Sequence, residues 1–268
     1  MERQQNRTEA YMGARARPAA AREESLRASA VSSAATAPTV RVLVGETGSR
    51  KLLARIQAHG WGRMWTTKRP TLYDGEPWGF DNGAWGAYCC GKRFPAEEFR
   101  RRVERARALP APYLAVLPDM VARGLGSVKM SIRWLESGEL PAWPWYLAVQ
   151  NGCCAQEVVA ELTGDSSALS AKSFEAYRGR ARVAGLFLGG TDAFKATALT
   201  WRIVATQLGI RFHYARAGTP RKIRYALASG ADSFDSALPL RAMWRFDRFE
   251  KMVTLGDPEH FMFPEAAK

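Results

Sequence analysis

Short apolar segments alternate with amphipathic ones from residue 40 onward, and this rhythm is the main structural signal of the chain. Eight apolar segments have the length and composition of β-strands. They are residues 40–45, 62–66, 78–83, 113–119, 145–152, 184–190, 211–218 and 232–237. The count of eight depends on the second and third segments, whose strand pattern is the weakest.

Helical patterns fill the intervals between these segments. Residues 95–109 begin at a proline and carry an apolar stripe at helical spacing. A second helix is predicted over 192–209, where a glycine provides the stop. In the segment 219–230, Thr219 is a suitable N-cap and Pro220 suits the first helical position.

Eight strands alternating with helices over about 229 residues predict an α/β fold, a (β/α)₈ TIM barrel, whose typical size is about 250 residues. Residues 40–268 are assigned to this domain. A doubly wound open sheet is the alternative, although no G-x-G-x-x-G motif follows the first strand.

Residues 1–39 have a different composition, rich in alanine, serine and arginine and nearly free of large apolar side chains. Such a segment buries too little surface to offset its ordering entropy, so a disordered basic tail is predicted. The whole chain has 39 basic and 26 acidic residues, a net charge of +13. This excess favours a polyanionic partner, nucleic acid first and an anionic membrane surface second. An arginine-rich genome composition would produce the same excess.

The remaining composition is that of a cytoplasmic protein. No apolar run reaches the roughly 18 residues of a membrane helix, and the first residues lack the apolar core of a signal peptide. The four cysteines form two adjacent pairs, Cys89-Cys90 and Cys153-Cys154, without C-x-x-C spacing. Reduced thiols are therefore expected, with a metal site built from both pairs as the alternative.

Polar residues follow several of the predicted strands. Because barrel active sites lie at the carboxyl ends of the strands, we expect these residues to face one mouth. An aspartate at a strand end also commonly caps the next helix, which is the alternative for each acid taken singly. The residues are Asp81, Asp119, Gln150 and Asp235, with Gly189, Gly190 and Gly218 at the ends of two further strands.

The chemistry of such a mouth is restricted by the motifs that the sequence lacks. It has no G-x-S-x-G elbow, no Walker loop and no H-E-x-x-H. His213 lies inside a predicted strand, where a core or barrel-lining role is expected. The work then falls to carboxylates acting as nucleophile and as general acid/base, a chemistry that suits glycosyl transfer through a covalent aspartyl intermediate.

Five stretches resemble the tRNA-guanine transglycosylase superfamily: "FDNGAWGAY", "LPDMVARG", "YLAVQNG", "GLFLGGT" and "GADSFDSALP", in this order. The resemblance covers about residues 60–240 and is most specific at "FDSALP" and "FDNGAW". It implies a (β/α)₈ barrel that replaces a guanine in a polynucleotide by a 7-deazaguanine.

The resemblance also implies roles for individual residues. Asp235 matches the nucleophile that attacks the sugar, and Asp81 matches the general acid/base for the leaving and incoming bases. Asp119 matches the acid that reads the amidine edge of guanine, and Gln150 matches the amide that reads its 6-oxo group. Trp85 takes the place of the aromatic ring that stacks on the purine. Asp232, in contrast, is expected to point to the opposite face and to be structural.

Further binding residues follow from the same resemblance. Gly185 matches a glycine whose N–H lies near the 6-oxo group, and the predicted substrate-binding set is completed by Asn82, Gly83, Gly189 and Gly190. The stretch "RAGTPRKIR" is similar to a nucleic-acid-contacting loop beside a helix N-terminus. Its phosphate-contact candidates are Arg216, Arg221, Lys222 and Arg224.

Departures from the family pattern indicate which branch the chain is most like. The tRNA enzymes carry a cysteine-rich zinc insertion near the C-terminus; no such cluster occurs here, so no zinc subdomain and no metal cofactor are expected. Gly190 stands where the family has a glutamate that supports an aminomethyl base, which implies a 7-cyano or 7-amido base.

A short, basic, zinc-less chain is most similar to the DpdA-type DNA deazaguanine transglycosylases of bacterial modification clusters and of phages that evade restriction. The resemblance therefore implies DNA as partner, together with a 7-deazaguanine base and proteins of a DNA-modification system. A reduced transglycosylase acting on tRNA and a non-catalytic nucleic-acid-binding barrel are the alternatives. Because the target guanine must leave the base stack, the nine tryptophans are candidates for a wedge.

Overall fold

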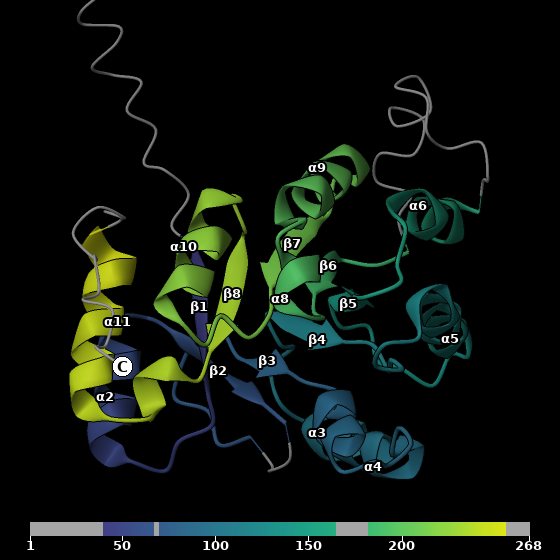
Figure 1. Ribbon diagram of the computed structural model, residues 1–268. Coiled ribbons are helices and arrows are strands. Elements are labelled where there is room, and N and C mark those ends of the chain that lie inside the picture. Colours follow the sequence, from purple (N-terminus) through teal and green to yellow (C-terminus); the bar gives the residue numbers. More distant parts are fainter. Residues whose placement is uncertain (1–39, 67–69, 165–181, 256–268) are drawn as a thin grey trace, which may run out of the picture. The chain divides into compact units, whose positions relative to one another are not determined.

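Eight parallel strands form a closed barrel in a computed structural model that describes residues 40–66, 70–164 and 182–255. The strands follow one another around the ring in chain order, and the eighth pairs with the first (Figure 1). The predicted (β/α)₈ fold is confirmed. The predicted tail, residues 1–39, lies outside the described residues.

Each strand falls inside a segment predicted from the sequence, including the second and third. The strands are β1 (Arg41–Gly45), β2 (Gly62–Trp65), β3 (Gly79–Phe80), β4 (Leu114–Val116), β5 (Trp145–Val149), β6 (Gly185–Leu188), β7 (Arg211–Tyr214) and β8 (Ser233–Ser236). Most are shorter than predicted at the carboxyl end. The residues left over there form the loops at the mouth of the barrel.

The helices lie outside the strand ring (Figure 1). They are α2 (Arg50–Ala58), α3 (Ala84–Cys89), α4 (Ala96–Ala106), α5 (Gly124–Glu136), α6 (Ala155–Thr163), α8 (Asp192–Lys195), α9 (Ala198–Leu208), α10 (Pro220–Ala228) and α11 (Met243–Leu255), with a 3₁₀ helix, η1 (Leu238–Leu240). The predicted N-cap of α10 is confirmed, because the Thr219 side chain accepts a hydrogen bond from the Lys222 N–H.

The single helix predicted over 192–209 is wrong, because the structure divides it into α8 and α9. The Thr197 hydroxyl donates to the Phe194 carbonyl at 2.6 Å, and Lys195 turns into the interior at the end of α8. No glycine or proline marks this break in the sequence. The predicted stop at Gly209 is confirmed by its left-handed backbone.

The barrel has an inner and an outer core, and alternation along each strand divides them. In β5, Trp145, Leu147 and Val149 pack outward against the helices, whereas Tyr146 and Ala148 point inward. The inner core also contains Leu43, Met64, Leu114 and Val116. Residue 150, directly after β5, is the next inward position, so the alternation itself brings Gln150 to the mouth.

The last helix packs against the first described one, and α11 lies beside α2 in Figure 1. Arg55 of α2 forms a hydrogen bond of 2.6 Å with Asp247 and also contacts Glu250. Phe246 and Phe249 pack on Trp61 with ring centroids 5.8 and 5.2 Å apart. The acids of α11 are therefore directed to one side of the helix, toward α2.

The surface has two exposed tryptophans. Of the nine in the sequence, only Trp85 and Trp244 are among the exposed large apolar residues, at 45% and 55%. The four cysteines are free thiols. No helix in the described part of the chain is long and apolar enough to cross a membrane.

Candidate functional site

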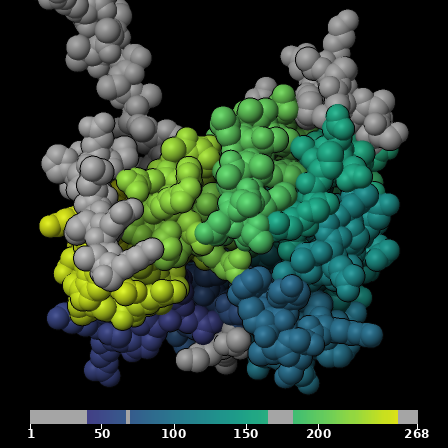
Figure 2. All heavy atoms as spheres, in the orientation of Figure 1, coloured from purple at the N-terminus to yellow at the C-terminus, as the bar shows by residue number. Residues whose placement is uncertain are grey.

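An open pocket lies at the carboxyl ends of the strands. Near the centre of the view in Figure 2 the surface is recessed between the blue atoms of α3 and α4 and the green atoms around α8. Most residues predicted for the site line this pocket. They are Asp81, Asn82, Trp85, Asp119, Gln150, Gly189, Gly190, Arg216 and Asp235.

The floor of the pocket is apolar and was not predicted from the sequence. It consists of Met64, Val116, Ala148 and Phe187, all of which belong to or pack against the inner core. These side chains fill the barrel below the mouth. The polar residues therefore stand as a rim above an apolar base, the usual composition of a small-molecule site.

Two predicted binding residues, Gly83 and Gly185, are not among the residues that line the pocket, and for Gly185 the prediction is wrong. Gly185 is the first residue of β6, and Gly189, four residues later, reaches the mouth. A Cβ at Gly185 would lie 2.4 Å from the Tyr146 ring. The glycine makes room for that ring inside the barrel, so it cannot place its N–H near a base at the mouth.

Of the four predicted phosphate-contact residues, only Arg216 lines the pocket. The other three, Arg221, Lys222 and Arg224, belong to α10 and are not among its lining residues. Lys222 forms an ion pair of 2.7 Å with Asp192, and the Arg221 guanidinium contacts the Tyr225 hydroxyl at 3.3 Å. Arg224 is half-buried. Contact between these three residues and nucleic acid stays a prediction.

Asp81 follows β3 directly and is held at both carboxylate oxygens. Its Oδ2 accepts from the Thr66 hydroxyl at 3.1 Å and its Oδ1 from the Gly83 N–H at 3.2 Å. Burial raises the pKa of Asp81 above its ordinary value, and the charge of Asp235 raises the pKa further. The Asp81 carboxyl is thus suited to hold and release a proton.

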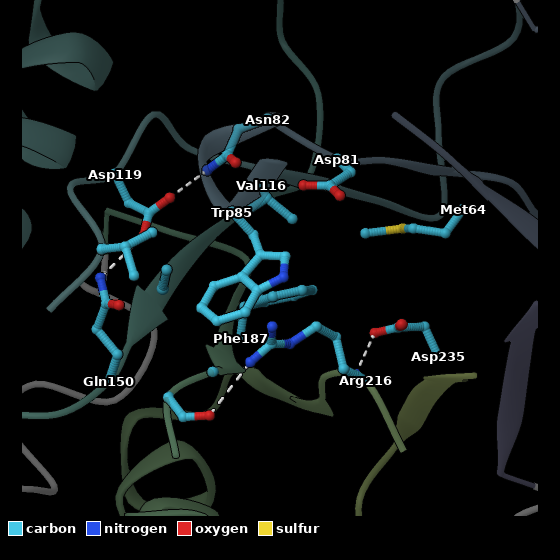
Figure 3. Close-up of a pocket in the computed structure, with 14 residues that line it drawn as sticks. Met64, Asp81, Asn82, Trp85, Val116, Asp119, Gln150, Phe187, Arg216 and Asp235 are labelled. Atoms are coloured by element: carbon cyan, nitrogen blue, oxygen red, sulfur yellow. Dashed lines mark hydrogen bonds between the residues drawn. The ribbon is translucent and has the colours of Figure 1, made fainter. Parts of the chain in front are cut away.

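Asp119 is buried and receives one amide on each oxygen. Asn82 donates to Oδ1 at 2.7 Å and Gln150 donates to Oδ2 at 2.8 Å (Figure 3). Burial raises the pKa of Asp119 to about 6, so the group is mostly ionised at neutral pH. A carboxylate has about four acceptor positions, so two remain for a ligand with paired N–H donors.

Gln150 lies in the pocket, but its amide is engaged by the protein. Besides Asp119, its Nε2 donates to the Met120 carbonyl at 3.0 Å, and its Oε1 accepts from the Ala122 N–H at 3.1 Å. The amide therefore fixes Asp119 and the loop after β4. In this arrangement its N–H₂ is directed at protein acceptors rather than at a ligand.

Asp235 lies on β8 across the mouth and receives two donors on one oxygen. The Arg216 N–H donates to Oδ1 at 2.9 Å, and His213 Nε2 lies 3.0 Å from the same atom. Among the described residues no hydrogen bond falls on Oδ2. The Asp235 side chain is 15% exposed. Its two donors both bind Oδ1, so Oδ2 is the carboxylate oxygen left for a ligand.

His213 is the functional residue that sequence reasoning missed. It is fully buried, stacks on Phe187 with ring centroids 4.8 Å apart, and its Nδ1 lies 2.8 Å from the Ser233 hydroxyl. A carboxylate only accepts, so Nε2 of a neutral His213 carries the proton and the Ser233 hydroxyl donates to Nδ1. The expectation that His213 lines the barrel is confirmed, and its contact with Asp235 gives it a further role.

Arg216 and Trp85 meet above the pocket. The Arg216 guanidinium carbon lies 3.8 Å from the centroid of the Trp85 ring, and its Nη2 donates to the Gly190 carbonyl at 3.3 Å. Figure 3 places this pair between Asp119 and Gln150 on one side and Asp235 on the other. A planar ligand must use the remaining face of Trp85 or displace the guanidinium.

Two buried cations hold the loops that carry the acids. Arg102 of α4 donates to the carbonyls of Asp81 and Asn82. Lys195 of α8 donates to the Ala215 carbonyl, next to Arg216, and burial followed by the charge of Arg216 lowers the pKa of Lys195 to about 8. Both loops are thus fixed from outside the pocket by side chains that do not line it.

Gly190 is required by its backbone. Its φ is +85°, and a Cβ would lie 2.6 Å from Asn151 Oδ1. A side chain at this position would strain the loop after β6, so the glycine leaves that part of the pocket without an acid.

Asp232 lies outside the pocket lining, where it binds Arg202 at 2.7 Å and the Phe212 N–H at 2.7 Å. A structural role for Asp232 agrees with these contacts.

Within residues 40–66, 70–164 and 182–255, no group of three histidine, cysteine or acidic side chains is arranged to hold a metal ion.

Comparisons with known proteins leave the family open. No protein-family model matches the chain, and no curated protein matches it significantly. Among solved structures, the Amycolatopsis orientalis BexX/CysO complex matches at 16% identity with a TM-score of 0.47, over 85% of this chain and 95% of that chain. A likeness at this level does not bear on function or partner.

Proposed function

We propose that this protein is a glycosyltransferase that exchanges guanine in DNA for a 7-deazaguanine base through a covalent intermediate on Asp235. The observation that carries the proposal is the sorting of three carboxylates within one pocket. Asp235 is oriented by two donors, Asp81 has a raised pKa, and Asp119 is presented by two amides. These are the environments that a nucleophile, a proton carrier and a base-reading group require.

In the first step, Oδ2 of Asp235 forms a bond to the C1′ atom of the target nucleotide as the C1′–N9 bond breaks. The electron pair of the broken bond stays on the guanine, and protonated Asp81 transfers its proton to the departing base. In the second step, N9 of the incoming base attacks C1′ and expels the Asp235 carboxylate. Asp81 takes the proton from that base, so the enzyme returns to its starting state.

Recognition of the base follows from the opposite side of the pocket. Guanine presents two parallel N–H donors along its amidine edge, and ionised Asp119 offers acceptors for both. Asn82 and Gln150 act here as positioning residues, because both donate to that carboxylate. Trp85 supplies a ring for stacking, a contribution of about 1–3 kcal/mol per base.

The choice of DNA and of the incoming base rests on the sequence features. The net charge of +13 favours a polyanion, and the resemblance to the zinc-less branch favours DNA over tRNA. Gly190 leaves no acid to pair with an aminomethyl group, which favours a 7-cyano or 7-amido base. The target guanine must be flipped out of the stack to reach the pocket.

The test is nucleoside mass spectrometry of total DNA and of tRNA from cells that express the protein and make 7-cyano-7-deazaguanine. An Asp235→Ala variant serves as the control. We expect a deazaguanine deoxynucleoside in DNA with the wild type and none with the variant. Modification confined to tRNA would reassign the acceptor. A wild type that modifies neither, while still binding nucleic acid, would support a non-catalytic barrel.

A further inference from the structure

A second open pocket flanks the first on the β7–β8 side. The loop after β7 contributes to both, because Arg216 lines the first pocket and Gly218 lines the second. The chain after β8 does the same, with Asp235 in the first and Leu238 in the second. Two residues of backbone span at most about 7 Å, so the two pockets are neighbours.

The lining of this second pocket is cationic on an apolar base. Arg241, Arg245 and Arg248 line it together with buried Phe249 and Met252, and none of its lining residues is acidic. Within the described residues Arg241 and Arg245 have no ion pair with a carboxylate. The acids of α11, Asp247 and Glu250, bind Arg55 of α2 instead, so the helix separates its charges onto two sides.

Trp244 supplies an aromatic surface in the same place. It is 55% exposed and lines the second pocket, and Arg245 and Arg248 lie 5.0 and 5.9 Å from its ring. The other exposed tryptophan of the chain, Trp85, lines the first pocket beside Arg216. Each pocket therefore combines one exposed indole with arginine.

We infer that the second pocket binds the DNA strand next to the target nucleotide, with phosphates on Arg241 and Arg245 and a neighbouring base on Trp244. Arginine is suited to phosphate by its planar donors, and a base can stack on an exposed indole regardless of sequence. This inference rests on the proposed function, because it places the target in the first pocket and its neighbour in the second.

The position of the pocket favours a nucleic-acid strand over an acidic peptide. The two pockets are at most about 7 Å apart along the backbone of the loop after β7, so a single bound strand can contact both. An acidic peptide would satisfy the arginines but would leave the indole and the apolar base without a planar partner.

The experiment is a binding titration of the full chain with a fluorescein-labelled single-stranded DNA oligonucleotide at several salt concentrations. The test variant is Arg241→Gln/Arg245→Gln. The matched control is Arg100→Gln/Arg101→Gln, which removes the same charge from two exposed arginines of α4. A second pair, Trp244→Leu and Trp244→Phe, tests stacking at an exposed position whose replacement leaves the core intact.

The slope of log affinity against log salt is negative, and we expect its magnitude to decrease by about 1.4 in the test variant. This is the loss of two single-strand phosphate contacts at about 0.7 each. The control should keep the wild-type slope. Trp244→Leu should weaken binding by about tenfold, and Trp244→Phe should restore most of the loss. Equal slopes for test and control variants would overturn the inference, as would a polyglutamate peptide that competes as strongly as DNA.

Exchange of labelled guanine into the same oligonucleotide separates this inference from the proposed function. Exchange with normal slopes in the test variant would leave the function and reject the second pocket. A reduced slope in the test variant together with no exchange by the wild type would keep the second pocket as a DNA-binding site and reject the transglycosylase.

Discussion

The two sides of the mouth are built in different ways. On the β3–β5 side, Asp119 is buried, and two buried amides, Asn82 and Gln150, each donate to one of its oxygens. On the β7–β8 side, Asp235 takes a donor from the Arg216 backbone and another from His213, and no amide side chain of the described residues bonds to it. The first side presents an acid through amides, whereas the second leaves one carboxylate oxygen directed away from its donors.

This difference matches the division between recognition and reaction. A group that reads a base benefits from a fixed geometry in a dry surrounding, which the amides give Asp119. A nucleophile needs an oriented but unblocked oxygen, which two donors on a single atom leave to Asp235. Replacing acids on each side should therefore produce effects of different kinds, and the largest should fall on the β8 side.

Asp235→Asn should lower the exchange rate by about 10⁴-fold or more, because the amide cannot form the glycosyl ester. DNA binding should persist, since the substitution removes a negative charge from the mouth. Wild type incubated with DNA should give a covalent adduct on a denaturing gel, and the variant should give none. Asp232→Asn, on the same segment but bonded to Arg202, is the matched control and should retain the adduct.

Asp81→Asn should lower the rate by about 10³-fold through loss of proton transfer. Guanine release needs protonated Asp81, so in the wild type its rate should decline as pH rises through the raised pKa of Asp81. Thr66→Val removes a hydrogen bond that lowers this pKa and should move the decline to higher pH. Identical rate profiles for the wild type and Thr66→Val would reject this assignment.

Asp119→Asn should change how stability depends on pH. Burial raises the pKa of Asp119 from 3.8 to about 6, so its stabilising contribution is full below 3.8 and is lost as pH rises through 6. The unfolding free energy of the wild type, relative to the variant, should fall by up to about 3 kcal/mol between pH 4 and 7. Urea unfolding across this range measures the difference, and a flat difference would contradict the burial of a titrating group.

His213→Phe should have the smallest effect, about a tenfold lower kcat with an unchanged KM, because it removes one hydrogen bond to Asp235 while keeping a ring against Phe187. His213→Gln, whose amide can donate, should recover part of the rate. Steady-state exchange kinetics would separate the two parameters. An increase in KM without loss of kcat would instead place His213 on the recognition side.

The sequence predicted the fold and most of the mouth because both depend on local patterns. Alternation and strand-end position brought Asp81, Asp119, Gln150 and Asp235 to one pocket. Strand β3 is only two residues long, Gly79–Phe80, but it was still predicted because the distinctive "FDNGAW" motif marks its end.

Contacts between residues of different elements could not be predicted from the sequence, because they depend on the register of the parallel strands and on how loops and helices pack. His213 reaches Asp235 because it pairs with Ser233 across β7 and β8, and no local pattern records that register. Gly185 was misplaced for a different reason: its role was taken from the resemblance, although it begins its strand and only the carboxyl end of a barrel strand faces the mouth. The Arg216–Trp85 contact joins the loop after β7 to helix α3 and has no signal of its own in the sequence.

The pairing of the first and last elements has a consequence for biosynthesis. Arg55 and Asp247, which bond across α2 and α11, lie 192 positions apart, and β1 has no β8 to pair with until the same late stage of translation. A nascent chain on the ribosome therefore carries an open sheet with two unpaired edges for most of its synthesis. Such edges are prone to aggregation, so chaperone assistance and slow translation of the last helices should raise the yield of folded protein.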